Sequence, residues 1–157
     1  MNRMIGPAVA FALALCPALA ADRNIKPAPP DQCRALAETL GKVAGIPLSA
    51  TTGRPAFPNN VKGDACLLSG KAIGLAIAFD ALDDKLGRSL TAWTRVQGYD
   101  ADGPYSTQKG FTKGETTLLY RLETDSPPGT CEDIVIADCK VPRDQWHWTL
   151  EVVAFVQ

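Results

Sequence analysis

The cysteines constrain the fold of this chain more than any other feature of its sequence. Five are present, and Cys33, Cys66, Cys131 and Cys139 lie beyond the first twenty residues. An even number of cysteines in an exported domain is typical of disulfide bonds. We predict Cys131–Cys139, because it closes a short loop, and Cys33–Cys66 by elimination. Zinc ligands usually come in close pairs such as C-x-x-C, and the sequence has none, so we expect no metal site.

Residues 1–20 predict export. One positive charge precedes the apolar run Ile5–Leu15, and Ala18 and Ala20 give the A-x-A pattern that a signal peptidase recognises. The apolar run is shorter than the ~20 residues that a membrane-spanning helix needs. Cys16 leaves lipoprotein processing open as an alternative, which the large residue before it disfavours. We therefore expect a signal peptide cleaved after Ala20, and a periplasmic or secreted protein.

Composition and charge restrict the partners of the chain. Hydrophobic residues make up 46% and charged residues 21%, which is typical of a globular domain. Lys and Arg number 16 against 17 Asp and Glu, so there is no basic excess to neutralise phosphates or an anionic membrane surface. We expect no nucleic acid, no membrane span and no cofactor. The single histidine also excludes every catalytic scheme that uses two imidazoles.

Hydrophobic periodicity predicts two main helices. The first is expected to begin at the N-cap Asp31 and to end at Gly45, with Cys33 among the apolar residues of its buried face. The second is expected to begin at the N-cap Asp80 and to continue as far as Arg95, with leucines four residues apart on one face. Both helices are therefore amphipathic and need a surface to pack against.

Alternating side chains predict the strands. Large and small residues alternate over 66–79, and a second long strand is expected over 146–156. Residues 105–112 and 115–124 predict a hairpin with glycine in its turn. Residues 47–64 are rich in Pro, Gly, Ser, Thr and Asn, so they predict a long irregular connection.

Helices and strands are grouped along the chain rather than strictly alternating. This order predicts an α+β fold: an antiparallel β-sheet of about four strands, with two main helices packed on one face and stabilised by disulfides. The proline-rich residues 21–30 predict an extended lead-in, and residues 31–157 a single domain.

His147 is the first candidate for acid–base chemistry, because its unperturbed pKa lies near neutrality. It lies between Trp146 and Trp148 in the final strand, so alternation places it on the face opposite two tryptophans that we expect in the core. No G-x-S-x-G motif supplies a nucleophilic serine. Asp100–Gly103 resembles the start of a calcium loop, but the twelfth position is Phe111 and not glutamate. We assign no catalytic residue.

Exposed aromatic and cationic side chains are the usual anchors of a recognition surface. Tyr99, Tyr105 and Phe111 lie within one turn-rich region, beside Lys109 and Lys113. We expect these five residues to form the binding face.

Three functions remain open. The sequence favours a small exported binding, inhibitory or accessory module over an enzyme, with another protein or an envelope component as its partner. The first alternative is a small secreted hydrolase that uses His147 or a carboxylate. The second is a subunit of an envelope assembly, docked through the small residues of the strand at Ala72–Ala78.

Overall fold

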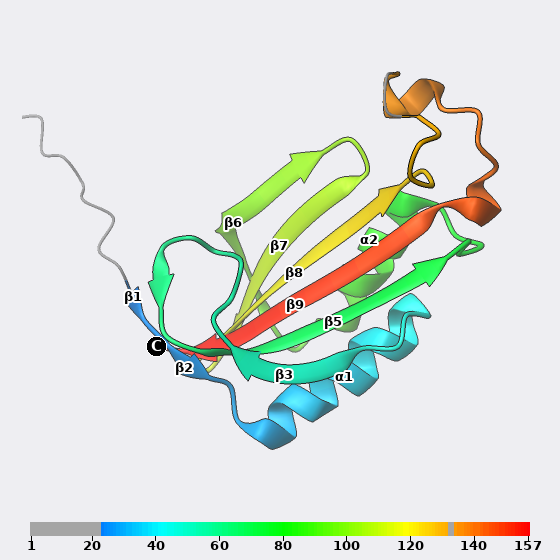
Figure 1. The fold of residues 1–157 in the computed structure, drawn as a ribbon. Helices are drawn as coiled ribbons and strands as arrows, with labels where there is room; N and C mark the ends of the chain where they lie inside the picture. The colour runs from blue at the N-terminus through cyan, green and yellow to red at the C-terminus, as the bar shows by residue number, and fades with distance from the viewer. Residues whose placement is uncertain (1–22, 132–133) are drawn as a thin grey trace, which may run out of the picture.

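The computed structural model describes residues 23–131 and 134–157 of the chain (Figure 1). Two α-helices lie on one face of a large β-sheet. The strands are β1 (Arg23–Asn24), β2 (Lys26–Pro27), β3 (Ser49–Gly53), β4 (Val61–Lys62), β5 (Ala65–Ile73), β6 (Thr94–Gly103), β7 (Ser106–Lys113), β8 (Thr116–Asp125) and β9 (His147–Val156). The helices are α1 (Pro30–Ala44) and α2 (Phe79–Ser89), with the 3-10 turns η1 (Ile136–Asp138) and η2 (Arg143–Gln145). The expected signal peptide, residues 1–20, lies outside the described residues.

The main sheet has seven strands within the described residues. Six follow the order β3-β5-β9-β8-β7-β6, and β2 pairs with the end of β9. All of these pairings are antiparallel. Strands β1 and β4 form a separate parallel pair. The predicted α+β class is confirmed, as are the two helices and the antiparallel sheet, whereas the predicted count of about four strands is too low.

The sequence pattern does not predict either edge strand of the main sheet, β3 or β6. β3 lies within residues 47–64, which the sequence predicts as an irregular connection, and its side chains are mostly exposed. β6 begins at Thr94, where the sequence predicts the last turn of a helix, because α2 already ends at Ser89. An edge strand has one unpaired side and need not bury large side chains. Its sequence therefore lacks the alternation that marks a central strand.

The helix ends differ slightly from the predicted ones. α1 begins one residue before Asp31, with Pro29 at the N-cap, because proline's fixed φ suits the first helical turn. It ends at Gly45, as predicted, with a left-handed φ of 70°. α2 begins one residue before Asp80, with Ala78 at the N-cap. Both aspartates lie in the first turn, where their charge favours the helix dipole, rather than at the cap.

Alternate side chains of the central strands face the helices and form the main core. Tyr120 of β8 and Trp148 of β9 pack there with Leu40 of α1 and Leu86 of α2. His147 precedes Trp148 and is exposed. Because successive side chains of a strand point to opposite faces, it lies opposite that tryptophan, as the sequence predicts.

The opposite face of the sheet is covered at one end. Ile25, Phe57, Leu119 and Phe155 form a second, smaller buried cluster there. β2 pairs with β9, and Ile25 is buried, so the described part of the proline-rich segment packs against the sheet.

Both predicted disulfide pairings are confirmed. Cys33–Cys66 joins α1 to β5, with the two Cα atoms 6.1 Å apart. Cys131–Cys139 closes a loop in the connection between β8 and β9, with the two Cα atoms 5.7 Å apart. The first disulfide fixes a helix to the sheet, and the second shapes a surface loop. Within residues 23–131 and 134–157, no helix is long and apolar enough to cross a membrane.

Candidate functional site

The candidate site lies at one end of the main sheet. The β6–β7 turn, the ends of β5 and β8, and the connection from β8 to β9 meet there (Figure 1). Two clefts of about 590 and about 490 Å³ share Tyr105 and Thr124 in their walls. We call the second one the Trp148 cleft; its wall includes Leu75, Ile77, Phe79, Tyr105, Arg143 and Trp148. Both volumes fall within the range of small-ligand sites, ~300–1,000 Å³.

Tyr105 occupies a turn position that favours glycine. Pro104 and Tyr105 connect the paired residues Gly103 and Ser106, and Tyr105 has a φ of 58°. A side chain in this left-handed region costs roughly 1–2 kcal/mol. The neighbouring strand holds the turn in place, because the Thr124 N–H donates to the Tyr105 carbonyl oxygen at 2.9 Å. Backbone strain of this kind is concentrated at functional sites, which makes Tyr105 a candidate for function.

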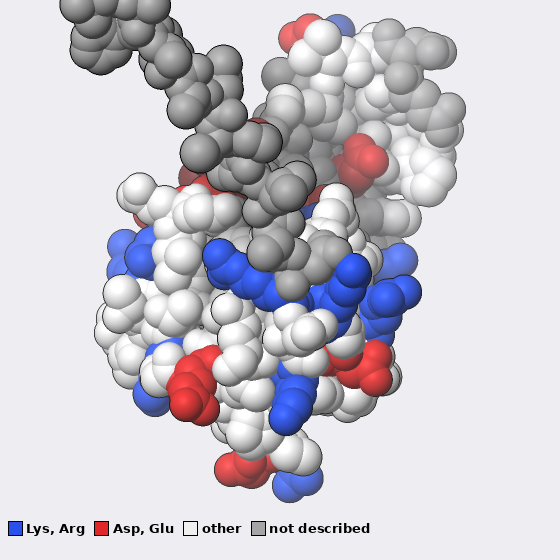
Figure 2. Space-filling model, turned by 90° about the vertical axis from the view of Figure 1, so that its left-hand side faces the viewer, with Lys and Arg blue, Asp and Glu red and all other residues white. Residues whose placement is uncertain are grey.

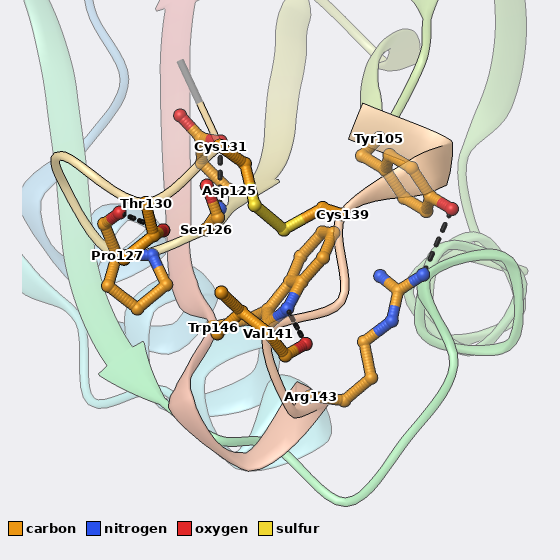
Figure 3. Close-up of a disulfide and its surroundings, with 10 residues drawn as sticks. All are labelled: Tyr105, Asp125, Ser126, Pro127, Thr130, Cys131, Cys139, Val141, Arg143 and Trp146. Carbon is orange, nitrogen blue, oxygen red and sulfur yellow. Dashed lines mark hydrogen bonds between the residues drawn. A yellow bond between two sulfur atoms is a disulfide. The ribbon is translucent and has the colours of Figure 1, made fainter. Parts of the chain in front are cut away.

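Arg143 is held by two aromatic rings. Its guanidinium carbon lies 3.8 Å from the ring centroid of Trp146 and 4.8 Å from that of Tyr105. One guanidinium nitrogen donates to the Tyr105 hydroxyl oxygen at 3.0 Å (Figure 3). Phe79 adds an edge contact to Tyr105, at 6.2 Å between ring centroids. These contacts orient an arginine that is otherwise exposed to solvent.

Ion pairing distinguishes Arg143 from two other arginines that lie over aromatic rings. Arg95 lies over Phe111 and pairs with Asp100 at 2.8 Å. Arg121 lies over Phe57 and is close to two carboxylates, at 3.9 and 3.8 Å. In the part of the chain that the structure describes, no carboxylate lies within ion-pair distance of Arg143. Its positive charge is therefore oriented but is not neutralised by any described carboxylate.

The two tryptophans next to His147 differ in their hydrogen bonding. Both are buried, as the sequence predicts. The indole N–H of Trp146 donates to the Val141 carbonyl oxygen at 3.0 Å (Figure 3). The Trp148 residue is only 5% exposed, and its indole N–H has no hydrogen-bond partner among the described residues. A buried donor without an acceptor costs ~1–3 kcal/mol, so Trp148 carries an unsatisfied buried group.

Gly74 shapes the Trp148 cleft and corrects the strand predicted over 66–79. β5 ends at Ile73, and Gly74 follows with a φ of 66°. A Cβ at Gly74 would collide with the backbone of Asp144, and its N–H donates to the Trp146 carbonyl oxygen at 2.9 Å. Glycine therefore lets the chain leave the sheet close to the β9 connection. Residues 75–78 line the cleft rather than forming the small-residue strand face of the assembly hypothesis.

The exposed apolar side chains are also found at this end. In the described residues, the exposed large hydrophobic side chains are Ile73 (66% exposed), Ile134 (51%) and Val135 (67%). Ile73 ends β5, and the other two lie in the loop that Cys131–Cys139 closes. The opposite end differs, because Figure 2 shows Lys and Arg side chains there, with Asp and Glu among them.

The structure does not bring the five predicted binding residues onto one surface. Only Tyr105 lies at the candidate site. Phe111 is buried in the core and stacks on Tyr120, because alternation in β7 turns it toward the helices. Lys109 forms an ion pair with a carboxylate of α2, and Tyr99 packs on the second buried cluster. Lys113 is exposed at the other end of the β6–β7 hairpin.

Lys109 belongs to a polar cluster that fixes α2 to the sheet. Its Nζ atom pairs with one carboxylate oxygen of Asp83, and the Tyr120 hydroxyl donates to the other at 2.7 Å. Burial and the Asp83 carboxylate raise the pKa of the Tyr120 phenol far above its ordinary value of 10.0. Each group has a partner, so the cluster serves packing and orientation.

No hydrogen bond or ion pair joins the His147 side chain to another group of the described residues. Asp125 is its cross-strand neighbour, but no hydrogen bond or ion pair between the two side chains is present in the described residues. The described ranges also contain no group of three or more His, Cys, Asp or Glu residues placed to hold a metal ion. The geometry at this end of the sheet suits binding by contact area and charge.

Sequence reasoning missed Arg143 and the Trp148 cleft. Arg143 lies between Pro142 and Asp144, in a segment without strand or helix periodicity. The one sequence feature that could have indicated its role is its proximity to two tryptophans. No family model matches the chain, and no curated protein or solved structure shows significant similarity to it.

Proposed function

We propose that the protein is a non-catalytic binding module that recognises another protein through the Tyr105 end of its sheet. One observation carries the proposal: Ile73, Ile134 and Val135, the exposed large apolar side chains of the described residues, are all found at this end, as is Arg143. Exposed apolar groups beside tyrosine, tryptophan and arginine are the usual composition of a binding hot spot.

The site is also preorganised, which lowers the entropic cost of association. The Cys131–Cys139 disulfide restrains the loop that exposes Ile134 and Val135. Arg143 is already oriented by Trp146 and by the Tyr105 hydroxyl. We also propose that the protein works in an oxidising compartment, periplasmic or secreted, because two disulfides of this kind form and persist there.

Site-specific crosslinking in the cells that produce the protein tests this function. p-Benzoylphenylalanine replaces Val135 in one variant and Lys113, at the charged end, in a matched control. We expect a discrete protein adduct from position 135 and none from position 113. Adding Arg143→Glu to the first variant should reduce the adduct strongly. An adduct from position 113 alone, or none from either, would contradict the proposal.

A further inference from the structure

We propose that the Trp148 cleft binds an apolar group that carries a single carboxylate, and that Arg143 pairs with this carboxylate. The inference rests on the binding function proposed above and names the chemistry that the site recognises. It starts from the walls of the cleft, which are formed mainly by residues 75–78 and by aromatic rings. Phe79 and Trp148 are stacked there, with 6.3 Å between ring centroids and an interplanar angle of 22°. Such walls favour a flat or small apolar group.

The charge on the cleft wall favours an anion. Arg143 lines the cleft and is fixed by its stacking on Trp146 and its hydrogen bond to Tyr105. Arginine presents a fork of donors that matches the two oxygens of a carboxylate. Arg95 and Arg121, which lie over rings in the same manner, have carboxylates of this chain beside them. Among the described residues, no carboxylate takes the corresponding place at Arg143, which a ligand carboxylate could therefore take.

The second unsatisfied group is also a donor. The buried indole N–H of Trp148 has no acceptor within residues 23–131 and 134–157. The Thr124 hydroxyl, also in the wall, already donates to the His147 carbonyl oxygen at 3.0 Å. The Arg143 guanidinium, which lines the cleft, is also a donor, so the ligand should contribute acceptor oxygens.

One negative charge suits this cleft better than two. Asp80, in the first turn of α2, also lines the cleft, and its carboxylate would repel a doubly charged group such as a phosphate monoester. The chemistry that fits is a monocarboxylate on an apolar group. Either a free aromatic acid or the C-terminal apolar residue of a partner protein carries it.

The test follows the indole N–H signals of the ¹⁵N-labelled protein during titration, with the Trp148 signal assigned by Trp148→Phe. The probes are 3-phenylpropionate and its neutral match 3-phenylpropanamide, and the peptide acetyl-Gly-Gly-Phe with a free or an amidated C-terminus. We expect a saturable shift of the Trp148 signal with both acids. Each amide should bind roughly tenfold more weakly, because one charge-assisted pair is lost. Tighter binding of the peptide acid points to a protein C-terminus, and tighter binding of 3-phenylpropionate to a free acid.

Arg143→Gln provides the second arm, and Arg95→Gln is its matched control. We expect the first variant to lose the preference for acid over amide and the second to keep it. Equal binding of acid and amide by the unmodified protein would overturn the proposal, as would an unchanged preference in Arg143→Gln or no saturable shift with any probe. Crosslinking from position 135 does not depend on these probes, so it tests the proposed function separately.

Discussion

Arg95 and Arg143 are located at opposite ends of the sheet and are stacked on aromatic rings in similar ways. Arg95 lies 5.0 Å from the ring centroid of Phe111, and Arg143 lies 3.8 Å from that of Trp146. Arg95 is neutralised by Asp100 and also donates to the Gly110 carbonyl oxygen at 3.0 Å. Arg143 has one polar partner among the described side chains, the neutral hydroxyl of Tyr105. Stacking orients a guanidinium, and the carboxylate beside it determines whether its charge is available to a ligand.

Phe111, which contacts Arg95, and Tyr105, which contacts Arg143, should differ most in their effect on stability. Phe111 is buried in the core, so Phe111→Ala should lower the free energy of unfolding by ~3–5 kcal/mol. Tyr105 is half-buried at a turn, so Tyr105→Ala should cost less than half as much. Urea unfolding of both variants measures the difference. Equal losses would show that Tyr105 is as much a core residue as Phe111.

Alkaline pH should lower the free energy of unfolding through Tyr120, which packs near Arg95 and far from Arg143. Tyr120, which stacks on Phe111, has a pKa raised by burial and by Asp83, so the folded protein holds the phenol proton more tightly than the unfolded chain. This contribution to stability is complete below pH 10 and is lost as the pH rises above it, by up to ~1.4 kcal/mol per pH unit. Unfolding midpoints at pH 8 and pH 11 measure the loss.

Tyr120→Phe removes the phenol and is the matched variant for that experiment. It should cost ~1 kcal/mol at pH 8, through the lost hydrogen bond to Asp83, and should lose less stability than the unmodified protein between pH 8 and pH 11. Tyr99→Phe, whose hydroxyl bonds to Arg23 at an exposed position, controls for removal of a tyrosine. Parallel pH curves for Tyr120→Phe and the unmodified protein would contradict the effect of burial.

Because the backbone at Tyr105 is left-handed, glycine should be tolerated there better than alanine. Tyr105→Gly and Tyr105→Ala both remove the ring, but only glycine adopts a φ of 58° without strain. We expect Tyr105→Gly to be more stable than Tyr105→Ala by ~1 kcal/mol. Differential unfolding of the pair measures this, and a more stable alanine variant would show that the turn is not strained.

Replacing the two arginines should give the smallest effect on stability. Arg95→Gln leaves Asp100 without its partner and loses the bond to Gly110, which should cost ~1 kcal/mol. Arg143→Gln leaves no carboxylate of the described chain unpaired, so its cost should stay within ~0.5 kcal/mol. Thermal unfolding of both variants separates the two cases. A larger cost for Arg143→Gln would mean that this arginine serves folding rather than binding.

The sequence predicts the parts of the fold that local patterns determine. Gly45 ends α1, residues near 105–124 form the hairpin, and both disulfides pair as expected. The edge strands β3 and β6 escape prediction because their mostly exposed side chains carry no apolar alternation. β5 ends early because Gly74 turns the chain away, a conformation that depends on contact with Asp144, far along the chain.

The candidate site is harder to predict, because residues distant in sequence form it. Of the five residues in the predicted binding face, only Tyr105 lies at the site. The side-chain alternation that turns Phe111 and Lys109 toward the helices depends on the register of β7 with β8. Arg143 and Trp148 become significant only when the β8–β9 connection packs beside Gly74.

The central claim is that Arg143 is oriented for binding while Arg95 and Arg121 are occupied by carboxylates of the chain. The most direct measurement follows the side-chain Nε–Hε NMR signals of all three arginines during a titration with 3-phenylpropionate, assigned by single Arg→Gln substitutions. We predict a saturable shift of the Arg143 signal, at concentrations that leave the Arg95 and Arg121 signals unchanged. Equal shifts of all three, or a shift of Arg95 or Arg121 without Arg143, would contradict the account.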